Sequence, residues 1–249
     1  MNSFRERAAA HIGKHGTKMA EDINSQQAVT EAMMATDQLK LVLFRNYARI
    51  VHCAKSGERM PVEERLMQRA QAAIASGGFA AEITPVTVKT RAGEVQVSMD
   101  EGPGKIKLDK IATLKPAFKK DGTITAASSS SINDGAAALV MMRASTAAKL
   151  GLKPLARLVA HAVHAQEPNW FATAPVGATQ KLLAKTGWAV GDVDLWEINE
   201  AFAVVPMALM TELAIPHEKV NVNGGACALG HPIGASGARI MVTLIHALK

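Results

Sequence analysis

The chain has 249 residues, of which 48% are hydrophobic and 20% are charged, a composition typical of a soluble globular protein with one large or two modest domains. No stretch approaches the roughly eighteen apolar residues of a membrane span, and the first residues lack the apolar core of a secretory signal. We therefore expect a cytoplasmic protein, with an organelle matrix as the alternative, and no membrane partner. The net charge of +6 is spread along the chain, which disfavours a nucleic-acid surface and favours a phosphorylated small molecule.

The first elements in chain order come after a segment, residues 1–60, that carries no repeat or catalytic signature. Pro61 and the two glutamates that follow it begin a predicted helix, whose apolar positions recur at three and four residues until Gly77-Gly78 ends it. A hairpin is expected next: its strands alternate through residues 83–88 and 95–99, around a turn at 91–94.

From residue 123 onward, predicted strands and helices alternate along the chain. The expected strands are Ala136–Met142, Leu155–Ala160, Val193–Ile198 and Val220–Val222. The expected helices are Thr146–Leu150, Val176–Lys185 with Gly187 as its end, Ala201–Leu213 and Ala235–Leu248. This order predicts a layered α/β unit in which helices cover a sheet of buried strands.

The strongest candidate for chemistry is a glycine-rich loop, Asn221–Arg239, which connects a predicted strand to a predicted helix. His231 stands in it as Gly-His-Pro, with glycines that let backbone approach a ligand. A histidine so placed can move protons near neutral pH or activate a thiol. The alternative is a loop histidine that is hydrogen-bonded for structural reasons only.

A second cluster, Glu197-Ile-Asn-Glu-Ala-Phe202, lies where a strand ends and a helix begins. Side chains at such ends in open α/β sheets commonly meet ligands, and Asn199 could hold a water or a carbonyl oxygen. Alternatively, Asn199 is the helix N-cap and Glu200 is a first-turn carboxylate that faces the helix dipole.

A third cluster extends from Phe118 through Asp-Gly-Thr to Ser-Ile-Asn-Asp-Gly-Ala136, and taken alone it is a polar loop. Together with the Asn-Glu-Ala-Phe and Gly-His-Pro-Ile-Gly-Ala-Ser-Gly segments, it resembles the thiolase family, whose motifs occur here in family order. The resemblance extends from about Gln68 to Lys249.

This resemblance implies a thiolase-like layered α/β fold. Residues 1–60 are then a poorly defined segment, 61–122 part of the family's loop domain, and 123–249 a shortened carboxyl-terminal domain. The half that bears the nucleophile and the extreme carboxyl terminus are expected to be missing. Related enzymes usually form dimers or tetramers, so a homo-oligomer is expected.

The resemblance also implies roles for particular residues. His231 matches the histidine that deprotonates the nucleophilic cysteine, and Asn199 matches the asparagine whose bound water helps to form an oxyanion hole. A thiol with a pKa of about 8.5 needs such a base at neutral pH. Four positions match contacts to the pantetheine arm of coenzyme A: Phe118, Ala126, Ser130 and Phe202.

The implied reaction is that of an acetyl-CoA C-acetyltransferase or 3-ketoacyl-CoA thiolase in fatty acid metabolism. It interconverts two acyl-CoA molecules with 3-ketoacyl-CoA and free coenzyme A. Coenzyme A and acyl-CoA are then substrates, no cofactor is bound permanently and no metal site is expected.

The two cysteines depart from the family pattern. Cys53 and Cys227 are both expected as reduced thiols, and neither stands in a catalytic cysteine context of the family. Cys227 is expected to be a packed thiol. A second hypothesis is therefore a catalytically silent relative that keeps a coenzyme A or oligomer surface. A ketoacyl synthase is disfavoured, because those relatives usually have a second histidine in place of Asn199.

Overall fold

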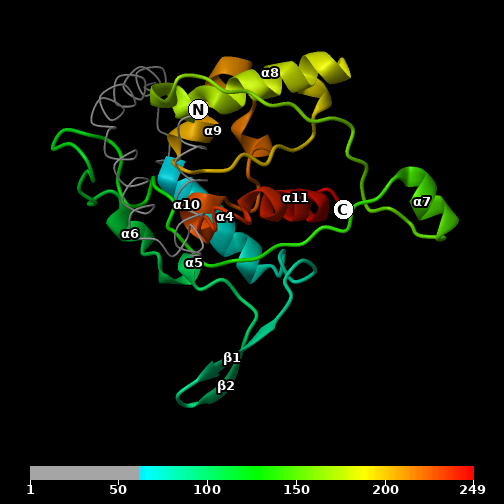
Figure 1. The fold of residues 1–249 in the computed structure, drawn as a ribbon. Coiled ribbons are helices and arrows are strands. Elements are labelled where there is room, and N and C mark those ends of the chain that lie inside the picture. Colours follow the sequence, from blue (N-terminus) through cyan, green and yellow to red (C-terminus); the bar gives the residue numbers. More distant parts are fainter. Residues whose placement is uncertain (1–61) are drawn as a thin grey trace, which may run out of the picture.

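The part of the chain that the structure describes, residues 62–249 of a computed structural model, is mainly helical with one pair of strands. The helices and strands are α4 (Val62–Ala75), β1 (Val86–Thr90), β2 (Gly93–Val97), α5 (Gly102–Lys105), α6 (Leu108–Ile111), α7 (Ala144–Lys149), α8 (Ala174–Thr186), α9 (Val204–Leu213), α10 (Ala226–Leu229) and α11 (Ser236–Ala247). Short 3-10 helices are η1 (Pro168–Thr173), η2 (Val190–Asp192) and η3 (His217–Lys219). Figure 1 shows α8 and α9 together at one end, and α4 beside α10 and α11 in the middle.

Helix α9 forms the centre of one apolar cluster. It is apolar on all sides and is buried from Val204 to Leu209, as expected of a helix that is surrounded by other elements. It packs against α8 and η1, and Ile198, Ile215 and Val220 complete the cluster. The predicted helices over residues 176–185 and 201–213 are confirmed, although α9 begins three residues later than expected.

Helix α4 forms a second apolar cluster with α6 and α10. Leu66, Met67 and Ala70 are almost fully buried on one of its faces, which explains the three- and four-residue spacing in the sequence. They pack against Ile111 of α6 and Cys227 of α10. The predicted helix before Gly77 is therefore confirmed.

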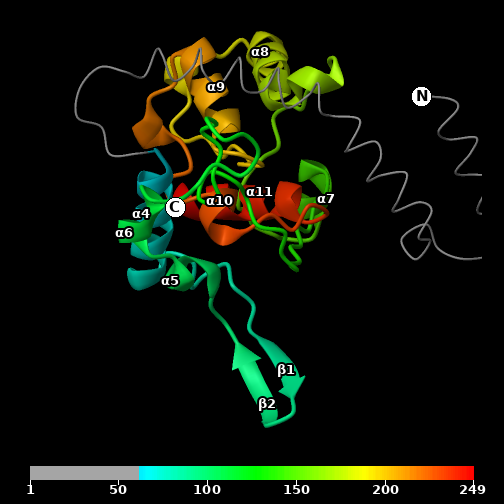
Figure 2. The same cartoon turned by 90° about the vertical axis from the view of Figure 1, so that its left-hand side faces the viewer.

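The predicted hairpin is also confirmed, and it projects away from the helices (Figures 1 and 2). Strands β1 and β2 are antiparallel and pair from Val86↔Val97 to Thr90↔Gly93. The connection between them is two residues, Arg91 and Ala92, which is tighter than the four-residue turn expected. Every residue of both strands is exposed, so the hairpin adds nothing to the cores of the described region.

The strands expected at residues 136–142 and 155–160 are not formed, and this prediction was wrong. Val140 is 91% exposed and Leu155 is 71% exposed. Within the part of the chain that the structure describes, neither segment makes a backbone–backbone hydrogen bond. An apolar run becomes a strand only when a neighbouring segment supplies hydrogen-bond partners, and no described segment pairs its backbone with either of these two.

The strands expected at residues 193–198 and 220–222 are reduced to one parallel bridge, Trp196↔Val220. The two segments do lie side by side, as expected of neighbouring strands. Backbone pairing stops at Asn221, whose φ of 46° turns the chain into the left-handed region.

Two kinds of feature are absent from residues 62–249. No helix there is long and apolar enough to cross a membrane. The same residues contain no group of three or more His, Cys, Asp or Glu side chains placed to hold a metal ion.

Candidate active site

The site is built on two neighbouring segments, residues 196–200 and 219–221. The amide of Trp196 donates to the carbonyl of Lys219 at 2.8 Å, and the amide of Asn221 donates to the carbonyl of Trp196 at 2.9 Å. The Asn221 side chain then continues the pairing: its Oδ1 accepts from the Ile198 amide and its Nδ2 donates to the Ile198 carbonyl, both at 2.8 Å. A fully buried carboxamide thus replaces a strand's backbone and fixes the segment that leads into Asn199.

The His231 loop leaves α10 and is fixed against the serine-rich segment. Gly230 has a φ of 94° and leaves no space for a side chain, because a Cβ there would lie 2.3 Å from Asn133 Oδ1. The next amide, that of His231, donates to the Ser131 carbonyl at 2.8 Å. Backbone contacts therefore set the position of the imidazole.

The His231 ring has a partner at each nitrogen. Its Nε2 lies 3.2 Å from Asn199 Nδ2, and its Nδ1 lies 2.7 Å from Ser236 Oγ. The Ser236 hydroxyl also lies 3.1 Å from the Pro232 carbonyl, and when it donates its single hydrogen there it accepts one from Nδ1. In that arrangement the proton of the neutral ring lies on Nδ1, and an unprotonated Nε2 faces Asn199.

The other end of the Asn199 carboxamide is an unsatisfied acceptor. Its Oδ1 is buried and has no hydrogen-bond partner among the described residues. Asn199 also lines a cavity of about 410 Å³, together with apolar side chains that include Phe171, Leu182 and Val205. Buried acceptors normally have partners, so this atom marks a place where a hydrogen-bond donor fits.

Three of the four positions matched to the pantetheine arm lie together. The rings of Phe118 and Phe202 meet edge to face with centroids 6.4 Å apart, and Phe118 is 51% exposed. Ser130 lies next to Phe202, because its amide and its hydroxyl both donate to the Ala201 carbonyl, at 3.2 and 3.0 Å. Ala126 is exposed in the turn that precedes this pairing, and no contact in the structure joins it to the others.

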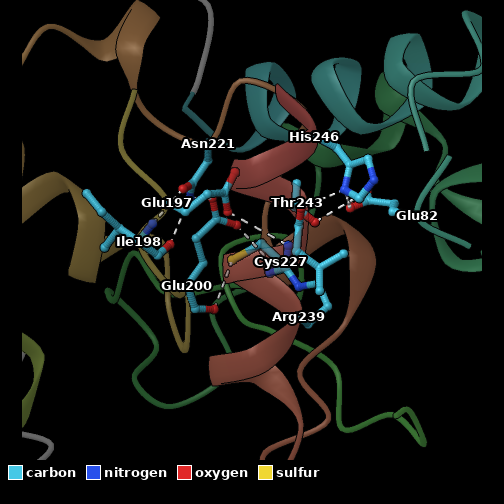
Figure 3. A network of polar contacts seen from close by, with 10 residues as sticks. Glu82, Glu197, Ile198, Glu200, Asn221, Cys227, Arg239, Thr243 and His246 are labelled. Atoms are coloured by element: carbon cyan, nitrogen blue, oxygen red, sulfur yellow. Dashed lines mark hydrogen bonds and ion pairs between the residues drawn. The ribbon is translucent and has the colours of Figure 1, made fainter. Parts of the chain in front are cut away.

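Two buried carboxylates, Glu197 and Glu200, lie on either side of Asn199 in the chain, and Figure 3 shows them in one polar network with Glu82. Burial raises the pKa of Glu197 to about 8, with Glu200 and Glu82 reinforcing the shift and Arg239 opposing it. Arg239 Nη1 lies 3.8 Å from Glu197 Oε2. Burial also raises the pKa of Glu200 and of Glu82. These acids therefore hold their protons to higher pH than exposed ones.

Sequence reasoning missed some of the residues that hold the site together. The alternative roles considered for Asn199 and Glu200 were wrong, because α9 begins at Val204 with Ala203 as its N-cap. Ser236 lies in the Gly-Ala-Ser-Gly run, but nothing in that run distinguishes a serine that contacts an imidazole. Nothing in the sequence separates Asn221 from the rest of the loop either.

The structure describes one of the two cysteines, Cys227. Cys227 is buried, as predicted, with its Sγ 3.8 Å from the Glu200 carbonyl, and it is not in a disulfide. Cys53 lies outside the described residues.

Comparison with known families gives two matches. Residues 152–249 match the family description "Thiolase, C-terminal domain", and residues 11–145 match "Thiolase, N-terminal domain". The finer division into residues 1–60, 61–122 and 123–249 remains a prediction.

Individual relatives agree with these matches. The chain is 52% identical over 183 residues to an acetyl-CoA acetyltransferase of Escherichia coli (strain K12), an alignment that covers 73% of this chain and 46% of the relative. It is 49% identical over 176 residues to a probable acetyl-CoA acyltransferase of Staphylococcus aureus (strain bovine RF122 / ET3-1), covering 70% and 45%. The chain therefore spans about half the length of the curated relatives it matches.

Solved structures extend the agreement to the fold. The crystal structure of the Bacillus anthracis acetyl-CoA acetyltransferase superposes with a TM-score of 0.72 at 44% identity, covering 80% of this chain and 52% of that one. A thiolase from Ascaris suum in complex with coenzyme A gives a TM-score of 0.67 at 39% identity, covering 76% and 48%. The expected thiolase-like α/β class is confirmed, and the chain belongs to the thiolase family.

Proposed function

We propose that this chain acts in acyl transfer on acyl-CoA thioesters, the chemistry of an acetyl-CoA C-acetyltransferase. The observation that carries the proposal is the pair formed by Asn199 and His231, whose Nδ2 and Nε2 atoms lie 3.2 Å apart, so that this imidazole nitrogen is placed to act as a base. A base of this kind suits a thiol, because the thiolate is the nucleophile and a free thiol is mostly protonated at neutral pH.

The proposed first step is a proton transfer from a thiol to Nε2 of His231. The thiolate sulfur then attacks the carbonyl carbon of a thioester or 3-ketoacyl group, and negative charge develops on the carbonyl oxygen. When the carbonyl re-forms, the bond from its carbon to the thioester sulfur or to the α-carbon breaks, and the leaving thiolate or enolate takes up the proton from Nε2. Ser236 keeps Nδ1 protonated throughout, so Nε2 is the nitrogen that accepts and later returns the proton.

Proton transfer also changes what Asn199 can do. Once Nε2 carries a hydrogen, it no longer accepts one from Asn199 Nδ2, so both groups become donors toward a nearby oxygen. Two such donors, one of them acting through a bound water, suit an oxyanion, for which one donor is typically worth roughly a hundred- to thousand-fold in rate.

The pantetheine arm is proposed to lie along Phe118, Ala126, Ser130 and Phe202. The exposed ring of Phe118 offers the apolar contact that such an arm needs, and Ser130 lies beside Phe202. Coenzyme A and acyl-CoA are proposed as substrates rather than as permanently bound cofactors. We extend the proposal to a homo-oligomeric, cytoplasmic protein of fatty acid metabolism.

One observation favours a second function, that of a silent relative which binds coenzyme A without turnover. The cysteine that the described residues contain, Cys227, is buried with its sulfur directed at a backbone carbonyl. A thiol packed in this way is a poor nucleophile.

The test measures coenzyme A binding by calorimetry and thiolysis of acetoacetyl-CoA, both with the full chain. An enzyme should lose roughly a hundred- to ten-thousand-fold in turnover on His231→Ala while binding persists. His161→Ala is the matched control, because His161 is exposed and its only polar contact in the described region is that of its backbone carbonyl with Lys185. Binding without turnover would identify the silent relative, and absence of binding would overturn both proposals.

A further inference from the structure

Glu200 has a buried carboxylate that the proposed chemistry does not use. It is 0% exposed and follows Asn199 directly in the chain. Its Oε1 accepts from Asn221 Nδ2 at 2.6 Å, and its Oε2 accepts from the Cys227 amide at 3.0 Å. Figure 3 shows the carboxylate between these two partners. One side chain therefore joins the segment that carries Asn199 to the loop that leads to His231.

The loop passes so close to this carboxylate that it needs a glycine. A Cβ at Gly225 would lie 2.2 Å from Glu200 Cδ, which is closer than any two unbonded carbons can approach. Gly225 is also the residue before α10, the helix whose end leads through Gly230 to His231. The Glu200 carboxylate thus sets the position of α10 in two ways, by packing against Gly225 and by accepting a hydrogen bond from the Cys227 amide.

Both partners of Glu200 are N–H donors, which explains why the residue is a carboxylate. A carboxylate offers two equivalent acceptors, whereas an amide of the same shape would place its own N–H₂ against one of the two donors. Burial opposes the charge of Glu200 and raises its pKa, while the hydrogen bonds from Asn221 and Cys227 act in the opposite direction. The bonds from these two donors are charge-assisted when the carboxyl is ionised, and such bonds are shorter and stronger than neutral ones.

We propose that Glu200 is a positioning residue, which holds the His231 loop so that Nε2 stays within hydrogen-bond distance of Asn199. Glu200 touches neither of these side chains in any contact the structure records and acts on them through the backbone on each side. The expected effect of Glu200 on catalysis rests on the proposed function, whereas its expected effect on the tautomer of His231 does not.

The test observes the His231 ring directly, by two-bond proton–nitrogen NMR of the full chain labelled with ¹⁵N-histidine. At a pH where the ring is neutral, the wild-type signals should be those of the Nδ1–H tautomer. Glu200→Gln should move them toward a mixture of the two tautomers, because the new amide repels one donor and releases the loop. Unchanged ring signals in a folded Glu200→Gln variant would overturn the proposal.

Glu197→Gln is the matched control, because Glu197 is a buried carboxylate three residues away whose partner is Arg239 of α11 rather than Asn221 or Cys227. Its His231 signals should equal those of the wild type, and a change equal to that of Glu200→Gln would also overturn the proposal. If Glu200→Gln does not fold, Glu200→Asp replaces it, since it keeps two acceptor oxygens but withdraws them by one methylene. A folded Glu200→Asp variant with wild-type ring signals would contradict the proposal.

A coenzyme A titration of the wild type separates the two proposals. If the wild type binds no coenzyme A but Glu200→Gln still changes the tautomer, the proposed function fails and the positioning role stands. If the wild type binds and turns over substrate while the tautomer is unchanged in every folded Glu200 variant, the positioning role fails alone.

Discussion

The sequence predicts strands in two regions of this chain, and these regions differ in their hydrogen-bond partners. Residues 196–200 lie beside 219–221, where one backbone bridge and the Asn221 carboxamide pair the backbone groups of Trp196 and Ile198. Residues 136–142 and 155–160 have no such neighbour, and their apolar side chains are largely exposed. The difference shows that an apolar pattern defines a buried segment only where hydrogen-bond partners are also supplied.

The largest loss of stability is expected for Asn221→Ala, in the region where residues 219–221 pair with 196–200. The substitution removes the partners of the Ile198 amide, the Ile198 carbonyl and Glu200 Oε1, all of them in a buried setting. Each unsatisfied group costs about 1–3 kcal/mol, so the free energy of unfolding in urea should fall by about 4 kcal/mol. Asn169→Ala, which removes an exposed bond to Glu167, should stay within about 0.5 kcal/mol. If Asn221→Ala lowered the free energy of unfolding no more than Asn169→Ala does, the comparison between the two regions would be contradicted.

Gly225→Ala should destabilise the same region by overpacking. The new methyl group would overlap the Glu200 carboxyl, and such crowding typically costs about 1–3 kcal/mol in the free energy of unfolding. Gly191→Ala supplies the control, since a Cβ there meets no atom within 4 Å. Equal denaturation midpoints for the two variants would show that the loop does not approach Glu200 in solution.

The buried carboxylates Glu197, Glu200 and Glu82 should make the free energy of unfolding fall as pH rises. Glu197 has a pKa of about 8 in the folded chain and an ordinary value of 4.5, so unfolding between these pH values releases a proton. Its contribution is fully present below pH 4.5 and is lost as pH rises through 8, with a slope of at most about 1.4 kcal/mol per pH unit. Urea denaturation across this range should show a shallower decline for Glu197→Gln. A decline equal to that of the wild type would assign the titration to other groups.

The smallest change in stability is expected in residues 136–142 and 155–160, which have no backbone partner among the described residues. Leu155 is 71% exposed, so Leu155→Ser should change the free energy of unfolding by no more than about 0.5 kcal/mol. The same change should lower light scattering at high protein concentration, because it removes an exposed apolar side chain. A loss above about 1 kcal/mol would mean that this segment is packed in solution and that the two regions are alike.

Features that depend on nearby residues were predictable from the sequence. The helix before Gly77 and the helix that ends at Gly187 follow from apolar spacing and from glycine in the left-handed conformation, which Gly187 adopts with a φ of 72°. The β1–β2 hairpin follows from alternation around a short turn. Two motifs also pointed to His231 and Asn199, whose side chains the structure places together.

Features that depend on distant partners were not predictable. Apolar runs at residues 136–142 and 155–160 indicated buried strands, but sequence alone does not say whether a neighbour is present. Ser236 and Glu200 carry no signal that separates a hydroxyl that fixes an imidazole, or a carboxylate that holds a loop, from ordinary polar residues. Only the folded chain shows that they act on residues elsewhere in the sequence.

The hydrogen bond from His231 to Ser236 ties acid–base chemistry to the end of a helix. Ser236 is the first residue of α11, and helix termini are the places where a folded chain opens most readily. Fraying of that first turn would free the hydroxyl, and the imidazole proton could then move to the other nitrogen. The fraction of molecules in which Nδ1 keeps its serine partner is therefore the fraction in which the start of α11 is wound.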